Sequence, residues 1–181
     1  MMGGIISAPT MIGILNGCTA KPTINWKPDF FTEDQGILIS RMAEIILPKT
    51  DTPGANDVGV PAFIESMVKS VYKPENRDLF MNGMKAFDEK ASSEHGDPFI
   101  ELDPEEQTAF LKSIHDVAVK EKEEEGSIEN KFLMTVKELT VAGFFTSEIG
   151  ATQLLQYDAV PGAYHGCLPV AHAGNGKTWA T

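Results

Sequence analysis

The chain has 181 residues, of which 42% are hydrophobic and 23% charged, enough for one domain with a hydrophobic core. Its formal net charge of -11 argues against nucleic acid as a partner, and against binding an anionic lipid surface by charge alone. The two cysteines, Cys18 and Cys167, are too few for a disulfide framework, a four-cysteine zinc site or an iron–sulfur cluster. No Cys-x-x-Cys-His run is present, which excludes the usual covalent attachment of haem.

Residues 1–17 are uncharged and resemble the apolar region of an export signal, being too short for a comfortable membrane span. They lead into Leu15-Asn16-Gly17-Cys18, which resembles a bacterial lipobox. We therefore expect cleavage before Cys18, lipidation of its thiol, and a tether over residues 18–29. Cys167 would then be a free thiol or an intermolecular link. The alternative is a buried N-terminal helix with an incidental cysteine.

Helical spacing and clear helix breakers predict a run of helices from residue 30 onward. Thr32 and Gln35 form a capping-box pattern at the first start, and Pro48 ends that helix. The turn-rich stretch 49–60 is predicted to be a loop. The residues expected to face the core are Ile37, Leu38, Met42, Ile45 and Ile46.

A second helix is predicted to start at Pro61 or Ala62, and a third at Pro74. Gly96 and Pro98 end that unit. The side chains expected to face inward are Phe63, Met67, Val68 and Val71 in the second helix, and Leu79, Phe80, Met84 and Phe87 in the third.

Asp103, followed by Pro104 and by Glu106, is a strong signal for the start of another helix. A further helix is predicted over 129–144, and Thr146 is expected to cap a last one. Inward positions of these helices are Phe110, Leu111, Ile114, Val117 and Ala118, then Phe132, Leu133, Val136, Leu139 and Thr140. Strand-type alternation is absent over any useful length. We therefore predict an all-α fold, an irregular bundle of about five to seven helices with an irregular C-terminal tail.

The last third of the chain interleaves small, aromatic and turn-forming residues without any catalytic spacing. Ser147 and Glu148 are adjacent but lie in a helix-start context, which favours capping. Residues 171–178 match a phosphate-binding loop superficially, but too few residues follow for the helix that such a loop needs. We predict no catalytic residues, no metal site and no cofactor in this chain.

Two sets of residues in this region keep alternatives open. Tyr157, Tyr164 and Trp179 are suited to anchor a protein interface, or to cover the chain's own core. His165, Cys167 and His172 could supply three metal ligands, which leaves a metalloenzyme as a further alternative.

Several motifs carry a family resemblance: FFTSEIGA at 144–151, QYDAVPG at 156–162 and YHGC at 164–167. Upstream, ILPKTDTPGA at 46–55 is followed by GVPAF at 59–63. Over roughly residues 30–181 the chain resembles the gluconate 2-dehydrogenase subunit 3 family.

The resemblance implies a non-catalytic small subunit that accompanies a large flavoprotein of the glucose–methanol–choline oxidoreductase type, and often a cytochrome c subunit. FAD, and in some complexes haem, would belong to those partners, and the small subunit would assist export, maturation or anchoring. Family members often carry a twin-arginine signal, and residues 1–17 contain no basic residue, so we expect the arginine pair to lie upstream of Met1. The expected location is the periplasm, anchored to the membrane through Cys18. The expected interface residues are Tyr157, Pro161, Gly162, Tyr164, His165, Cys167 and Trp179. A stand-alone periplasmic lipoprotein with a binding or scaffold role is the alternative.

Overall fold

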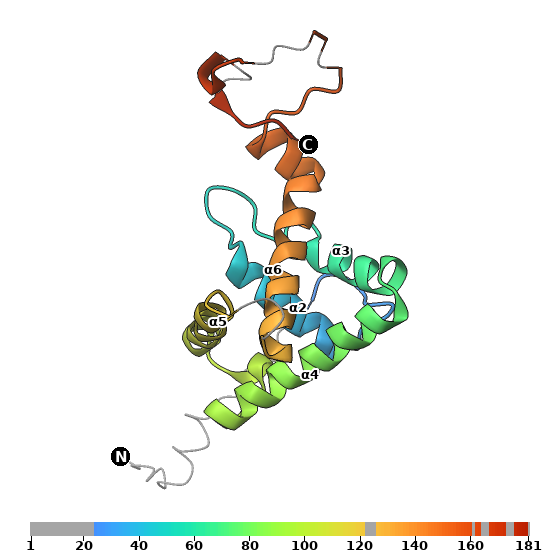
Figure 1. Ribbon diagram of the computed structural model, residues 1–181, viewed down its shortest axis with the longest axis vertical. Coiled ribbons are helices and arrows are strands. Elements are labelled where there is room, and N and C mark those ends of the chain that lie inside the picture. Colours follow the sequence, from blue (N-terminus) through green and yellow to red (C-terminus); the bar gives the residue numbers. More distant parts are fainter. Residues whose placement is uncertain (1–23, 122–125, 161, 164–166, 173–175, 181) are drawn as a thin grey trace, which may run out of the picture.

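The computed structural model is a bundle of helices from which the C-terminal end of one long helix projects (Figure 1). The structure describes residues 24–121, 126–160, 162–163, 167–172 and 176–180. Its helices are α2 (Glu33–Ile46), α3 (Val60–Ser66), α4 (Pro74–His95), α5 (Pro104–Ala118) and α6 (Ile128–Thr146), with the short helices η1 (Met67–Val71), η2 (Phe99–Glu101), η3 (Gly150–Leu154) and η4 (Val170–His172). The prediction of an all-α fold is confirmed.

Capping boxes begin two of these helices where the sequence predicted them. At α2, the Thr32 hydroxyl accepts from the Gln35 N–H at 3.3 Å, and the Gln35 side chain accepts from the Thr32 N–H at 2.9 Å. At α5, the Asp103 N–H donates to Glu106 Oε2 at 3.2 Å. Each box gives partners to N–H groups that a helix start otherwise leaves unpaired.

Helix α6 packs against α2, α3, α4 and α5 and forms the axis of the bundle (Figure 1). Phe87 lies at the centre, with its ring centroid 5.2 Å from that of Phe99, 5.1 Å from Phe110 and 5.7 Å from Phe132. The predicted inward residues of α6 are all buried: Phe132, Leu133, Val136, Leu139 and Thr140. Burial of apolar side chains around α6 therefore stabilises this body.

Three residues predicted to face the core are exposed instead: Val71 by 63%, Leu79 by 59% and Val117 by 49%. Val71 ends the π-helical turn η1, whose extra residue per turn rotates it off the buried face. Leu79 precedes the buried Phe80 on α4, and successive residues of a helix point about 100° apart. Val117 lies in the last turn of α5, beyond the buried part of that helix.

Among the residues that the structure describes, no helix has the length and apolar character needed to cross a membrane.

Candidate interaction surfaces: the arm and the loop between α2 and α3

A joint at the end of α6 turns the chain into a projecting segment, residues 147–180, which we call the arm (Figure 1). The Ser147 hydroxyl donates to the Phe144 carbonyl oxygen at 2.6 Å and accepts from the Gly150 N–H at 3.0 Å. The prediction that Thr146 caps the next segment is wrong, because Thr146 is the last residue of α6 and its hydroxyl donates to the Ala142 carbonyl. Ser147 performs the capping, one position later.

Gly150 lets the joint close. A Cβ atom at this position would overlap the carbonyl oxygen of Phe144, so any other residue forces the backbone apart. The π-helical turn η3 follows, and its end is marked by the Leu155 N–H donating to the Gly150 carbonyl at 3.1 Å. The FFTSEIGA motif is therefore mainly structural: Phe144 is buried in the core, Ser147 caps, and Gly150 allows the close approach.

The far part of the arm is closed by an isolated parallel bridge between Gln156 and Trp179. The Gln156 N–H donates to the Thr178 carbonyl at 2.7 Å, and the Ala180 N–H donates to the Gln156 carbonyl at 2.8 Å. The Lys177 ammonium group adds a hydrogen bond to the Gln153 carbonyl. The tail predicted to be irregular thus includes this bridge and the short helix η4.

The arm exposes large apolar side chains. Tyr157 is 56% exposed, Val160 81%, Leu168 46% and Trp179 46%. The last residue that packs against the hydrophobic core is Leu154. Of the described residues beyond it, none belongs to that core, so the exposed side chains of Tyr157 and Trp179 do not cover it.

Of the other predicted interface residues, the structure describes two, Gly162 and Cys167. Gly162 is exposed and adopts a φ of +63°, and the Cys167 thiol is exposed and free. Pro161, Tyr164 and His165 lie outside the described residues, as does the predicted lipidation site Cys18.

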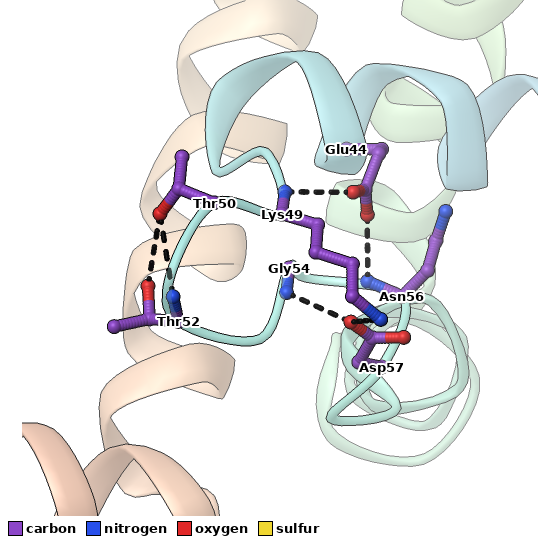
Figure 2. A network of polar contacts seen from close by, with 7 residues as sticks. All are labelled: Glu44, Lys49, Thr50, Thr52, Gly54, Asn56 and Asp57. Carbon is purple, nitrogen blue, oxygen red and sulfur yellow. Dashed lines mark hydrogen bonds and ion pairs between the residues drawn. The ribbon is translucent and has the colours of Figure 1, made fainter.

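The loop between α2 and α3, residues 47–59, carries the upstream motif and is held by a carboxylate of α2 (Figure 2). Glu44 accepts from the Lys49 N–H at 3.0 Å through Oε1 and from the Asn56 N–H at 3.1 Å through Oε2. A Cβ atom on Gly54 would overlap the Glu44 carboxylate and lie 2.7 Å from the Lys49 nitrogen. Glycine is therefore required for the loop to fold over Glu44.

Asp57 ties the two ends of this loop together. Its carboxylate accepts from the Gly54 N–H at 3.1 Å and lies 3.0 Å from the Lys49 ammonium nitrogen (Figure 2). The hydrogen bond from Lys49 and that from the Gly54 backbone hold the pKa of Asp57 below its ordinary value. Residues 48–52 at the tip are nevertheless exposed, with the Thr50 and Thr52 hydroxyls 3.3 Å apart. The loop thus presents a fixed backbone to its surroundings.

A further polar centre is the buried carboxylate of Glu65 on α3, which holds the segment 24–31 that we call the strap. Glu65 Oε1 accepts from the N–H groups of Asp29, Phe30 and Phe31 at 2.9, 2.7 and 2.8 Å. Lys69 pairs with the Asp29 carboxylate. Part of the predicted tether, residues 24–29, belongs to this segment.

The strap also packs along α2. The Trp26 indole donates to the Ser40 hydroxyl at 3.2 Å, and a Cβ atom on Gly36 would lie 2.9 Å from the Pro28 ring. Sequence analysis did not identify Glu65 as a functional or structural centre. The sequence does contain a signal for such a role. Glu65 is an acidic residue between Ile64 and Val68, on a helix face that is otherwise apolar.

The described residues contain no group of three or more His, Cys, Asp or Glu side chains arranged to hold a metal ion. Of the three ligands considered from the sequence, Cys167 and His172 are exposed and His165 lies outside the described residues. Ser147, the serine weighed as a nucleophile, is engaged with the backbone of its own joint.

The fold defines the chain as an all-α domain with a projecting arm. Residues 33–162 match the family model described as gluconate 2-dehydrogenase subunit 3, and the chain belongs to that family. The match covers α2 to α6, the loop, the joint and the first part of the arm. No curated protein and no solved structure matches the chain.

Proposed function

We propose that this chain is a non-catalytic accessory subunit of a membrane-associated, FAD-dependent sugar or sugar-acid dehydrogenase complex of the gluconate type. In this proposal it assists the export, maturation or anchoring of a large flavoprotein of the glucose–methanol–choline type, and a cytochrome c subunit completes some such complexes. The observation that carries the proposal is the family membership over residues 33–162. FAD and haem belong to the partner subunits.

Two surfaces suit a subunit whose role is binding. The arm exposes Tyr157 and Trp179, and none of its described residues beyond Leu154 packs against the core. The loop holds its exposed tip, residues 48–52, in one conformation through Glu44 and Asp57. Pre-ordered surfaces lose less conformational entropy on binding than flexible ones. The proposed interface on the arm comprises Tyr157, Pro161, Gly162, Tyr164, His165, Cys167 and Trp179.

The proposed anchor is a lipid on Cys18, which places the protein on the periplasmic side of a bacterial membrane after export by the twin-arginine route. The test is fractionation of cells that express the chain with its native leader. Cys18→Ser should move the chain and its flavoprotein from the membrane fraction to the soluble fraction, while Cys167→Ser should leave the chain itself in the membrane. Retention of the Cys18→Ser protein in the membrane would overturn lipid anchoring.

The accessory role is tested by a tagged pull-down from membranes solubilised in mild detergent, with an absorbance spectrum of the eluate. We expect a second polypeptide of flavoprotein size together with the bands of oxidised flavin. The control is the same tag on an unrelated periplasmic lipoprotein. A colourless single polypeptide would overturn the accessory role and favour a stand-alone lipoprotein.

A further inference from the structure

In the outer part of the arm, residues 155–180, none of the described residues belongs to the hydrophobic core. The hydrophobic core ends at Leu154, and beyond it the described residues are held by the bridge between Gln156 and Trp179 and by Lys177. Ordering a backbone costs conformational entropy that burial normally offsets, and two paired strands alone are marginal in water. Since the described residues of the outer arm bury little apolar surface within this chain, they are suited to bury it against another surface.

The backbone of the bridge leaves one edge unpaired. Gln156 uses its N–H and C=O with Thr178 and Ala180, the residues on either side of Trp179. Because hydrogen-bonding groups alternate along an extended strand, the N–H and C=O of Trp179 point away from Gln156. No backbone hydrogen bond among the described residues uses them. A partner strand could therefore pair with the chain at Trp179.

The side chains and charges indicate what kind of surface fits this edge. Of the chain's 26 acidic and 15 basic residues, only Glu148, Asp158 and Lys177 lie in the arm. The arm is thus almost uncharged on a strongly acidic protein, while Tyr157 and Trp179 are about half exposed. Depletion of charge together with exposed aromatic residues is typical of the centre of a protein interface. The complementary surface is uncharged and apolar.

We infer that the arm docks on the flavoprotein partner by strand addition, with Trp179 as the paired residue and the Trp179 and Tyr157 side chains as anchors. This inference rests on the proposed function. Strand addition combines backbone hydrogen bonds with pockets for alternate side chains. A lipid surface is the poorer occupant, because hydrocarbon cannot pair the open N–H and C=O of Trp179.

The experiment uses the full chain and measures flavin per tagged polypeptide in the membrane pull-down. Trp179→Ala should lower this ratio about tenfold or more, because the aromatic anchor is lost. Trp179→Pro should lower it further than Trp179→Ala, because proline lacks the ring and also the N–H that the partner strand would use. Trp179→Phe keeps both the ring and the N–H and should retain most of the flavin. The control is Leu79→Ala, which removes an exposed apolar side chain from the body and should leave the ratio unchanged.

Each alternative has its own outcome. A flavin-free pull-down of the wild-type chain would overturn the proposed function itself. Normal flavin recovery with Trp179→Ala would overturn docking through the arm, and recovery with Trp179→Pro equal to that with Trp179→Ala would overturn strand addition. Two other outcomes would show that the inference is wrong. If light scattering shows a dimer of this chain that Trp179→Ala abolishes, the arm binds a second copy. If Trp179→Ala releases the chain alone from flavin-free lipid vesicles, the arm binds the membrane. Equal thermal unfolding of all variants establishes that the body remains folded.

Discussion

The helical body, residues 24–146, and the arm, residues 147–180, differ in what holds their backbones in place. The body surrounds α6 with side chains such as Phe87 and Phe110, which are buried and in ring contact. In the described part of the arm beyond Leu154, the backbone is held by hydrogen bonds, and the Tyr157 and Trp179 side chains are about half exposed. Aromatic residues therefore stabilise the fold in the body, whereas in the arm Tyr157 and Trp179 remain exposed and are free to bind a partner.

The sharpest way to break this comparison is to remove one aromatic side chain from each region. Phe87→Ala should destabilise the protein by about 3–5 kcal/mol, because it empties the centre of the ring cluster. Trp179→Ala should change the free energy of unfolding by no more than about 0.5 kcal/mol, as for other surface substitutions. Urea unfolding followed by far-UV circular dichroism measures both values. Similar losses for the two variants would show that the arm belongs to the core.

The next largest effect concerns the strap. Glu65→Ala removes the shared acceptor of three backbone N–H groups and should cost roughly 1–3 kcal/mol. It should also speed proteolytic cleavage within residues 24–31, which limited proteolysis with mass spectrometry detects. Glu65→Gln retains an acceptor oxygen and should have the smaller effect on both readouts. The control is Glu75→Ala, on the first turn of α4. An effect equal to that of Glu65→Ala would contradict a specific role for Glu65.

A substitution at the joint between the body and the arm should lower the free energy of unfolding by less than the substitutions of Phe87 and Glu65. Gly150→Ala places a methyl group on the Phe144 carbonyl and should cost about 1 kcal/mol, at the low end for overpacking, because the arm can move away from the body. Small-angle scattering should show a changed arm direction. The matched control is Ala151→Gly, a change of the same size that creates no clash. An unchanged scattering curve for Gly150→Ala would contradict a fixed joint.

The smallest expected effect is the pH dependence of the loop. Because the folded-state pKa of Asp57 is lowered, its contribution to stability is present above its ordinary pKa of 3.8 and is lost as the pH falls through the lowered value. Asp57→Asn should therefore lower the thermal midpoint near neutral pH, and the difference from wild type should vanish in acid. Asp51→Asn at the exposed tip is the control. A difference between Asp57→Asn and wild type that persists in acid would contradict the ion pair with Lys49.

Sequence patterns predicted the parts of the fold that depend on neighbouring residues. The Thr32 and Asp103 caps lie within a few positions of their partners, and the inward face of α6 follows one helical period. The π-helical turn that exposes Val71 leaves no local signal. The sequence placed capping chemistry at both Thr146 and Ser147, and the structure shows that Ser147 alone caps the following segment.

The polar centres depend on contacts that no sequence pattern reports. Glu65 and the strap are 34–36 residues apart, and Glu44 and Asn56 are 12 apart. The motif around Gly54 marked the loop as unusual, but the need for glycine there became visible only with the Glu44 carboxylate in place.

The position of Glu65 along the chain sets an order of events during synthesis. The N–H groups of Asp29, Phe30 and Phe31 leave the ribosome 34–36 residues before the carboxylate that accepts from them. The strap can be seated only after α3 has been made and has formed. The earliest-made segment that the structure describes is thus fixed only when a residue made 34–36 positions later is in place, and its seating reports that α3 has formed.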